Sequence, residues 1–372
     1  MKDVIITHET LTFRNIKKIL VIKLRHIGDV LLTVPAFRAL RENFSDAHIS
    51  ALVNSGTEEV LSGNPLIDEI IIFDRNIKKI SSPQKYIKEV SFMKTIRRKG
   101  FDMVVDLTSS DRAAMISFFS GARYRIAYDS GRNGLFGKRY LYTHLAKKQG
   151  DQHAVLRNLD VIRQFGIDTE NIYLDFFIPE EARMFVKRIF EENNIPPHPP
   201  LSKGGQRGVK VVHIHPTSRW LFKCWNDEYM AEVIRWLLDK GAKVLVTSSA
   251  ERHEIEKVKG ILSLVGSHQS LIDLAGGTTI KQLAAIADAS NVFIGVDSAP
   301  MHIAAAVGTH VIAIFGAGVQ SWKPWGKDHV VIFKEAVSRN GTDRKERIKR
   351  NLSQITPEDV IEKIKGFLFN NR

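Results

Sequence analysis

The fold is decided by one stretch, Val292-Phe-Ile-Gly-Val-Asp-Ser-Ala-Pro-Met-His-Ile-Ala-Ala-Ala-Val-Gly308. Residues 292–296 are apolar and rich in β-branched side chains, which predicts a buried parallel strand. Asp297 closes the strand, Ser298 can cap the next helix, and Pro300 suits a first helical turn because its missing N–H needs no partner there. A strand that leads through an acidic residue into a helix N-terminus is how an α/β sheet holds a phosphorylated ligand. The alternative is an ordinary βα turn in which Asp297 only caps the helix.

Length and composition indicate the class of protein. The chain has 372 residues, too many for one compact core, and its composition of 44% hydrophobic and 26% charged residues is that of a globular protein. A single cysteine, Cys224, excludes a disulfide framework and indicates a reducing compartment. No apolar run approaches the ~20 residues that span a bilayer, and residues 1–15 do not read as a signal peptide. We therefore expect a cytoplasmic protein.

The positive charge is concentrated in one segment. The net charge is +13, and residues 75–148 hold 17 Lys/Arg against 5 Asp/Glu, so 17 − 5 = +12 of it lies there. Such a patch attracts a polyanion, which could be a nucleic acid, an anionic membrane face or a phosphorylated glycolipid. The alternative is a face that only confers solubility. A nucleic-acid-binding protein is disfavoured because the segment has no recognised binding motif and no aromatic residues at repeat spacing.

Strands alternate with helices in both halves of the sequence, which predicts parallel sheets. The first half has expected strands at 18–23, 48–53, 67–73, 103–107 and 123–127, and helices at 30–42, 86–99 and 153–165. The second half has expected strands at 210–215, 242–247, 271–274, 292–296, 311–315 and 330–333, and helices at 226–240, 251–264, 278–287 and 360–369. Residues 128–148 are expected to be loop-like, and the highly charged residues 339–350 are expected to be an exposed loop or a strained helix start.

A break in the pattern separates the halves. Residues 195–208 hold four prolines and three glycines in fourteen positions, which cannot form a helix or a sheet interior. We therefore expect an α/β protein of two Rossmann-like domains that face each other across a cleft. The expected parts are an N-terminal domain at 1–194, a Pro/Gly-rich linker or insertion at 195–208, a C-terminal domain at 209–355, and a C-terminal helix at 356–372 that packs back on the N-terminal domain.

Three charged residues are expected to converge at that cleft. Asp29 follows the first strand, where parallel sheets bind ligands, while Lys223 and Asp297 belong to the second half. The alternatives are a helix cap for Asp29 and a solvated loop lysine for Lys223. The sequence has no D-x-D pair, Walker P-loop, H-E-x-x-H motif or Cys/His cluster, so we expect no metal site. We also expect His213 and His215 to face opposite sides of their strand, which would keep them from sharing one metal ion.

Three motifs resemble the bacterial lipopolysaccharide heptosyltransferases. They are Ile19-Leu-Val-Ile-Lys-Leu-Arg-His-Ile-Gly-Asp-Val-Leu-Leu-Thr-Val-Pro35, then His215-Pro-Thr-Ser with Lys223-x-Trp225, and Gly295-Val-Asp-Ser-Ala-Pro-Met-His302. Their order and spacing agree over almost the whole chain, and within the family the chain is most similar to the core heptosyltransferase III type. One departure is Ala299-Pro300, where many members have a Gly beside the Ser or Thr.

The resemblance implies a GT-B glycosyltransferase. Such an enzyme moves a heptose from ADP-L-glycero-D-manno-heptose to the inner core of lipopolysaccharide, with inversion and without a metal or other cofactor. The donor would lie against the C-terminal domain and the phosphorylated lipid A–inner core acceptor against the N-terminal one. The implied location is the cytoplasm, in peripheral contact with the inner membrane, with no nucleic-acid partner. The alternatives are a transferase for another nucleotide sugar and a non-catalytic sugar-nucleotide binder.

The resemblance also implies roles for individual residues. Asp29 would be the general base, and Asp297 would hydrogen-bond the heptose. The remaining donor-binding residues would be Thr217, Ser218 and Lys223 at the diphosphate, Ser298, Ala299 and His302 beside it, Glu251 at the ribose and Thr278 at the adenine. A structural role is the alternative for His302. The acceptor's anionic groups would meet basic residues of the charged segment, for which we choose Arg123, Arg125, Arg132, Lys138 and Arg139.

Overall fold

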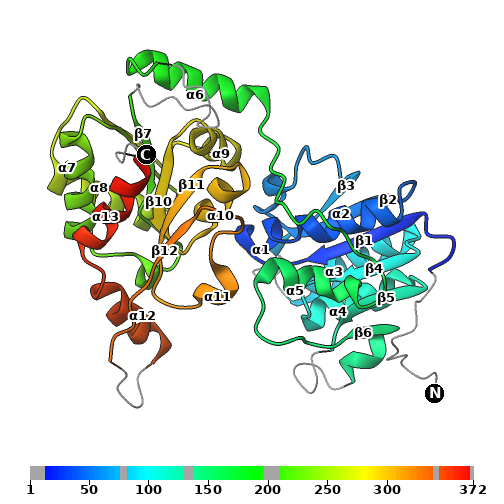
Figure 1. The fold of residues 1–372 in the computed structure, drawn as a ribbon. Coiled ribbons are helices and arrows are strands. Elements are labelled where there is room, and N and C mark those ends of the chain that lie inside the picture. Colours follow the sequence, from blue (N-terminus) through cyan, green and yellow to red (C-terminus); the bar gives the residue numbers. More distant parts are fainter. Residues whose placement is uncertain (1–12, 76–81, 130–136, 197–208, 338–342, 369–372) are drawn as a thin grey trace. The chain divides into compact units, whose positions relative to one another are not determined.

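The computed structural model describes residues 13–75, 82–129, 137–196, 209–337 and 343–368 (Figure 1). The chain divides into two compact units, Met1–Asp175 (unit 1) and Phe176–Arg372 (unit 2). Each unit contains a six-stranded sheet in which every described strand pair is parallel. The predicted pair of Rossmann-like sheets is thereby confirmed.

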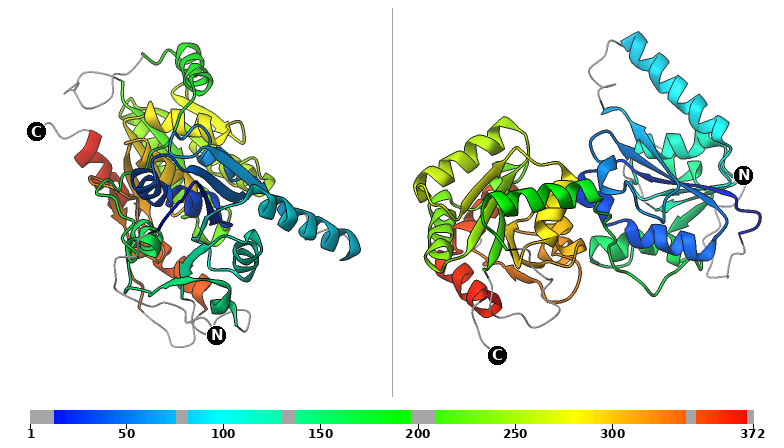
Figure 2. Two further views of the ribbon diagram at one scale, coloured as in Figure 1. Left: turned by 90° about the vertical axis from the view of Figure 1, so that its right-hand side faces the viewer. Right: turned by 90° about the horizontal axis from the view of Figure 1, so that it is seen from above.

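The sheet of unit 1 has the order β3-β2-β1-β4-β5-β6. Its elements are β1 (Lys18–Lys23), α1 (Ile27–Leu31), α2 (Val34–Asn43), β2 (His48–Asn54), η1 (Glu58–Val60), β3 (Glu69–Phe73), α3 (Ser82–Lys99), β4 (Met103–Asp106), α4 (Asp111–Ser120), β5 (Tyr124–Tyr128), η3 (Lys138–Leu141), β6 (His144–Ala146) and α5 (Ala154–Arg163). Leu20, Ile22 and Val104 face α3 and α4, where they pack with Ile96 and Ile116. Helices α2 and α5 pack together on the opposite face (Figure 2).

The sheet of unit 2 has the order β12-β11-β10-β7-β8-β9. Its elements are α6 (Glu180–Glu192), β7 (Val211–His215), η5 (Leu221–Lys223), α7 (Asp227–Asp239), β8 (Lys243–Ser248), α8 (Arg252–Val265), β9 (Leu271–Ala275), α9 (Ile280–Asp288), β10 (Val292–Val296), α10 (Ala299–Ala306), β11 (His310–Ile314), α11 (Val319–Trp322), β12 (Val330–Ile332), α12 (Arg344–Ser353) and α13 (Pro357–Leu368).

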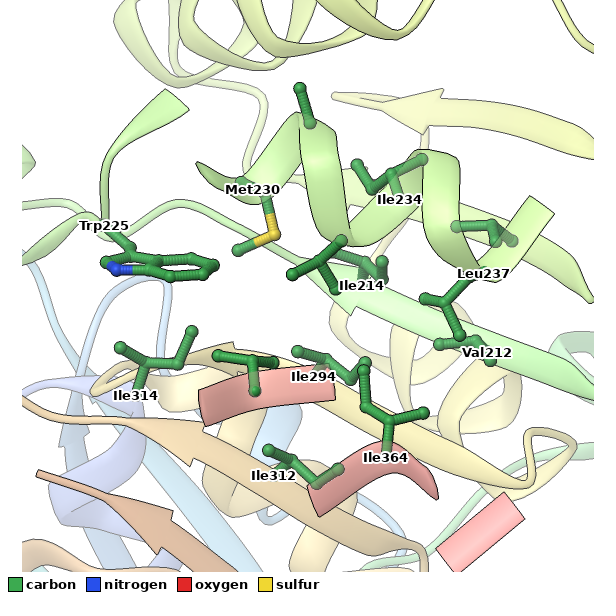
Figure 3. Packing of buried hydrophobic residues seen from close by; sticks show 14 of the residues in the cluster. Val212, Ile214, Trp225, Met230, Ile234, Leu237, Ile294, Ile312, Ile314 and Ile364 are labelled. Carbon is green, nitrogen blue, oxygen red and sulfur yellow. The ribbon is translucent and has the colours of Figure 1, made fainter. Parts of the chain in front are cut away.

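Alternate strand residues of unit 2 enter separate cores, because successive side chains of a strand point to opposite faces. On one face, β7, β10 and β11 meet α7 and α13; the residues shown there are Val212, Ile214, Ile294, Ile312 and Ile314 with Trp225, Met230, Ile234, Leu237 and Ile364 (Figure 3). On the other face, Phe293 and Phe315 pack against Met301 of α10. Both faces are covered, so the strands read as continuous apolar runs rather than alternating ones.

The expected domain boundary at residue 194 is wrong. The boundary lies between Asp175 and Phe176, so α6 belongs to unit 2. Its apolar side, including Val186 and Phe190, packs against Val211 and Ile286. Residues 195–208 therefore fall inside unit 2, between α6 and β7, rather than between the units; 197–208 lie outside the described residues. Proline and glycine content identifies an irregular segment but does not locate a domain boundary. The residues on which the apolar face of α6 packs decide that α6 and the segment after it belong to unit 2.

The C-terminal helix is part of unit 2. Helix α13 packs on α7 and on β11 and β12, with Val360 and Ile364 in the core of unit 2. The helix begins with reciprocal capping bonds across its first turn: the Thr356 N–H donates to the Asp359 carboxylate at 2.8 Å, and the Asp359 N–H donates to the Thr356 hydroxyl at 3.4 Å.

Three local features refine the expected elements. The helix expected at 30–42 is interrupted at Thr33, whose hydroxyl donates to the Val30 carbonyl at 2.6 Å. Strand β6 lies within the expected loop 128–148. Helix α12 lies within the charged stretch, and its buried Ile348 and Leu352 pack on the loop that follows β11. A Cβ on Gly316 would come within 2.6 Å of Ile348, so only glycine allows this approach.

Candidate functional site

Two neighbouring strands carry the candidate donor site of unit 2. Strands β7 and β10 pair with His215 beside Gly295, so the loops that follow them leave the same edge of the sheet. A Cβ on Gly295 would lie 2.9 Å from the His215 carbonyl oxygen, which means that glycine permits the close approach of the two strands. The residues from Thr217 to Lys223 and those from Asp297 to His302 therefore follow adjacent strand ends, as the sequence predicts.

An ion pair joins the two loops. The Lys223 ammonium lies 2.6 Å from a carboxylate oxygen of Asp297, and the two side chains are 26% and 16% exposed. Lys223 ends η5, which packs against α12, and its own N–H donates to the Trp220 carbonyl at 2.8 Å. The structure thus brings together two residues that the sequence placed 74 positions apart. The Lys223 ammonium is therefore accessible to a ligand, and both residues of the ion pair lie on ordered backbone.

Several hydrogen-bonding groups on the segments that follow the strands of unit 2 have no partner among the described residues. The main-chain N–H groups of Thr217 and Ser218 donate no hydrogen bond to any residue in the described ranges. The hydroxyl oxygens of Ser298 and Thr278 are buried and also make no hydrogen bond to described residues. Ser298 occupies the N-cap position of α10, but its side chain forms no capping bond, which corrects the expected role. Buried polar groups are normally satisfied, so orphaned ones indicate a place for a ligand.

The other donor candidates are placed as follows. Ala299 begins α10 and is partly exposed, whereas His302 lies one turn later and is buried. Glu251 is exposed at the N-cap of α8 and makes no capping bond. Thr278 precedes Thr279, the N-cap of α9, whose hydroxyl accepts from the Gln282 N–H at 3.2 Å. All of these lie on segments that follow the strands of the unit 2 sheet at its carboxyl edge.

Asp29 lies in the first turn of α1, at the carboxyl end of β1 in unit 1. Its half-buried carboxylate makes no hydrogen bond or ion pair with the residues that the structure describes. The surrounding backbone is fixed, because the Leu32 N–H donates to the Gly28 carbonyl at 3.1 Å and the Val30 N–H to the His26 carbonyl at 3.0 Å. Asp29 is therefore an available acceptor for a proton on an ordered turn, rather than a side chain used to cap its own helix.

Sequence reasoning missed two buried charges beside this turn. The Lys23 ammonium donates to the Leu107 carbonyl and the Asn158 side chain, each at 2.8 Å, and burial lowers the pKa of Lys23 to about 8, opposed by the charge of Asp29. Burial also raises the pKa of Asp106, which accepts hydrogen bonds from the Tyr142 hydroxyl and the Thr108 N–H. Each of the two residues ends an apolar strand, and a charged residue at such a position was the signal that the sequence offered for them.

The five acceptor candidates do not form one group. Arg123 and Arg125 lie at the start of β5, and the strand register places that start at the amino end of the sheet, opposite to Asp29. Arg123 is exposed and lies over the Tyr124 ring. The Arg125 guanidinium donates to the carbonyls of Leu141 and Ala122, each at 2.7 Å, so it already serves unit 1. We therefore remove both from the acceptor site.

The other three candidates differ. Lys138 is buried, donates to the Ser109 carbonyl at 3.2 Å and lies 3.5 Å from the Asp111 carboxylate, beside the loop that follows β4. Arg139 is more exposed and lies 3.9 Å from the carboxylate of Asp129, which follows β5. Arg132 lies outside the described residues. Lys138 and Arg139 are thus near the carboxyl ends of strands, where Asp29 also lies.

Comparisons with known proteins agree on one family. A family model described as glycosyltransferase family 9 (heptosyltransferase) matches residues 90–351. Lipopolysaccharide heptosyltransferase 3 of Escherichia coli is 31% identical over 350 residues, which cover 93% of this chain and 97% of that protein. This chain belongs to glycosyltransferase family 9.

Solved structures agree with the fold of this family 9 glycosyltransferase. A family 9 glycosyl transferase from Veillonella parvula DSM 2008 has a TM-score of 0.76 at 21% identity, over 95% of this chain and 98% of that one. The E. coli heptosyltransferase WaaC, solved with ADP-2-deoxy-2-fluoro heptose, has a TM-score of 0.70 at 21% identity, over 94% and 99% of the two chains. The expected GT-B class, built from two Rossmann-like units, is confirmed.

Among the described residues of this family 9 enzyme, no group of three or more His, Cys, Asp or Glu side chains is arranged to hold a metal ion. Of the helices within the described ranges, none is long and apolar enough to cross a membrane.

The expected orientation of two histidines is wrong. His213 and His215 both lie within hydrogen-bond distance of the Thr247 hydroxyl, at 2.8 Å and 2.9 Å, so they occupy the same side of β7. Side chains two positions apart on a strand share a face, which is the physical reason for the correction. Burial lowers the pKa of His215 to about 4 and that of His213 well below its usual 6.5.

The lowered pKa values of His213 and His215 predict that acid destabilises unit 2 of the family 9 enzyme. Below pH ~6.5 the unfolded chain takes up protons that the native His215 does not accept until pH ~4, so the free energy of unfolding falls across that window. The loss for His215 alone is about 3 kcal/mol, at 1.36 kcal/mol per pKa unit. Urea unfolding followed by tryptophan fluorescence measures unit 2 specifically, because all five tryptophans belong to it. His215→Asn should reduce the dependence between those pH values and leave the part due to His213, whereas His253→Asn, at an exposed position, should retain it in full.

Proposed function

We propose that this enzyme transfers a heptose from ADP-L-glycero-D-manno-heptose to the inner core of lipopolysaccharide, with inversion and without a metal. The observation that carries the proposal lies in one loop of unit 2, which holds both the partly exposed Lys223 ammonium and the N–H groups of Thr217 and Ser218, for which the described residues provide no acceptor. It is supported by the similarity to a heptosyltransferase 3 and by the ADP-heptose analogue in a fold relative. The class of reaction follows from the family; the donor, the acceptor and the stereochemistry are the proposal.

The donor would bind to polar and charged groups at the carboxyl edge of the unit 2 sheet. A diphosphate accepts hydrogen bonds and charge, so it suits the Thr217 and Ser218 N–H groups, the Lys223 ammonium, and the α10 N-terminus at Ser298 and Ala299. His302 lies beside the phosphates, and Asp297 hydrogen-bonds the heptose. Glu251, which is exposed, would meet the ribose, and the orphaned Thr278 hydroxyl would meet the adenine.

The chemistry requires one base and one charge stabiliser. Inverting transfer is a single displacement: the acceptor oxygen forms a bond to the anomeric carbon as the bond to ADP breaks. The acceptor hydroxyl loses its proton to Asp29, whose carboxylate has no protein partner in the described chain. The leaving ADP gains negative charge, which the Lys223 ammonium and the loop N–H groups stabilise. These groups supply the stabilisation that a metal ion supplies in other transferases.

The acceptor would be a phosphorylated lipid A–inner core molecule. Its anionic groups fit the basic residues near the carboxyl edge of unit 1, Lys138 and Arg139, together with Arg132. Arginine binds phosphate and carboxylate in a bidentate manner, which suits such an acceptor.

A peripheral membrane contact is proposed for α3. Its exposed side carries Lys94 and Arg98 around Ile87, which is 65% exposed, and Tyr86 is 70% exposed. A basic helix with exposed apolar side chains suits an anionic lipid surface. We expect binding to vesicles that contain anionic lipid, and we expect it to weaken as salt is raised. The variant Ile87→Ser/Lys94→Glu should bind less than Lys259→Glu, an exposed change in unit 2; equal binding of the two variants contradicts the proposal.

The decisive experiment is a transfer assay with a lipopolysaccharide acceptor that lacks one heptose. Mass spectrometry should show one added heptose with ADP-heptose as donor, and the anomeric configuration of the product should be inverted. Activity should persist in EDTA. Transfer from another nucleotide sugar, with none from ADP-heptose, favours the alternative transferase, and ADP-heptose binding without turnover favours a non-catalytic binder.

A further inference from the structure

Five buried polar side chains lie together in unit 2. They are His213 and His215 of β7, Thr217 in the next loop, Thr247 of β8 and Glu254 of α8, none more than 3% exposed. Burying polar groups is costly unless each is hydrogen-bonded, so their arrangement has to be accounted for atom by atom.

The contacts form one continuous chain. The Thr247 hydroxyl lies 2.8 Å from His213 Nε2 and 2.9 Å from His215 Nδ1. At the other end of the His215 ring, Nε2 lies 3.4 Å from the Thr217 hydroxyl. That hydroxyl lies 2.7 Å from Glu254 Oε2. The chain therefore runs from His213 through Thr247, His215 and Thr217 to Glu254.

When both histidines are neutral and Glu254 is ionised, only one proton arrangement satisfies every contact. A carboxylate cannot donate, so the Thr217 hydroxyl must donate to Glu254. His215 Nε2 must then carry a proton and donate to Thr217, which leaves His215 Nδ1 bare to accept from Thr247. The single Thr247 proton is thereby used, so His213 Nε2 must donate to Thr247. His213 Nδ1 is left without a proton, which agrees with its having no hydrogen-bond partner among described residues.

The reverse direction fails on two counts. In that arrangement the ring proton of neutral His213 lies on Nδ1, a buried atom without an acceptor in the described structure. It also needs a protonated Glu254 to donate to Thr217. A buried N–H without an acceptor loses its hydrogen bond to water and gains none in return, so this arrangement is disfavoured.

We propose that this chain is a positioning relay, in which neutral His213 and His215 are both protonated on Nε2 and Glu254 holds Thr217 in place for donor binding. The proposal rests on the donor role given to the loop 216–225. It changes the part played by Thr217, whose hydroxyl proton is committed to Glu254 and is not available to a diphosphate. Thr217 then offers the donor its main-chain N–H, which is free in the described structure. Glu254 is a positioning residue, because it acts only through Thr217.

The fixed segment also carries the ion-pair lysine. Thr217 stands at the start of the loop and Trp225 at its end, where the indole N–H donates to the Ile355 carbonyl at 3.0 Å. Lys223 lies between these two anchors. Loss of the Thr217 anchor should therefore loosen the N–H groups and Lys223 together, which weakens donor binding more than it slows the chemical step.

The first test reads the protons directly. Histidine ¹⁵N shifts, recorded at about pH 7 on protein with ¹⁵N-labelled histidine and assigned with His213→Gln and His215→Gln, should show both rings protonated on Nε2 only. Thr217→Val should alter the His215 signals, and Thr217→Ser should restore them. A proton on Nδ1 of either ring, or a doubly protonated ring, overturns the relay. This result does not depend on the sugar that the enzyme uses, so it separates failure of the relay from failure of the proposed function.

The second test reads the positioning effect. Thr217→Val should raise KM for the ADP-sugar donor by about tenfold, the worth of one charge-assisted hydrogen bond, while kcat changes less. Glu254→Gln should shift KM in the same direction, and Thr217→Ser should return it to the wild-type value. Unchanged KM in both Thr217→Val and Glu254→Gln contradicts the proposal, as does an equal fall of kcat in Thr217→Val and Thr217→Ser. Tryptophan fluorescence confirms that each variant keeps unit 2 folded.

Discussion

Asp29→Asn should lower kcat for heptose transfer by about 10²–10⁴-fold, the usual contribution of a general base. The amide has almost the same shape as the carboxylate but cannot accept the acceptor's proton. Asp29 is suited to this role because its carboxylate is half-buried on a fixed turn and makes no bond to the described protein. The dissociation constant of the donor should be nearly unchanged, because the donor groups all belong to unit 2.

Steady-state kinetics and calorimetric titration with ADP measure these two quantities separately. Asp46→Asn is the matched control, since Asp46 is an exposed carboxylate of the same unit and lies between α2 and β2. It should keep wild-type kcat. If Asp29→Ala or Asp29→Asn retains turnover, the base is another group, and the assignment of Asp29 is wrong.

Lys223→Met should lower kcat/KM by about 10²–10³-fold, as expected when one charged stabiliser of a leaving group is removed. In the free enzyme the Lys223 ammonium is neutralised by Asp297 at 2.6 Å. A bound diphosphate would provide a second anionic partner for the same ammonium. The methionine keeps the length and apolar stem of lysine but removes the charge, so the remaining Asp297 carboxylate would repel the donor as well.

Binding of ADP and single-turnover transfer should both weaken in Lys223→Met. Lys223→Arg should recover part of the binding, because it restores the charge but not the shape of the ammonium. Lys259→Met is the matched control, since Lys259 is an exposed lysine of the same unit. Asp297→Asn should affect the transfer rate more than ADP affinity, because its proposed partner is the sugar. Wild-type ADP affinity in Lys223→Met would exclude Lys223 from the diphosphate site.

The candidate residues of the two units differed in how far the sequence could predict their placement. Asp29, Lys223 and Asp297 were found because each lies beside a strand end or in a short motif, which are local signals. The basic residues of unit 1 were chosen from the density of positive charge along the sequence, which does not say at which end of the sheet each side chain lies. Arg125 has the right chemistry for an anion, but its guanidinium is bonded to two carbonyls of its own unit. Charge counts cannot separate an arginine that binds a ligand from one that supports a loop.

The sequence by itself determined the succession of strands and helices, the two parallel sheets, the turn that carries Asp29 and the loop ends at Lys223 and Asp297. These depend on periodicity, capping and chain order, which are properties of neighbouring residues. Only the tertiary structure decided that α6 and α13 belong to unit 2, and that Thr217 is bonded to Glu254, 37 positions away. The physical reason is that a polar or apolar face specifies the kind of partner it needs. Which segment provides that partner depends on contacts between residues far apart in the chain.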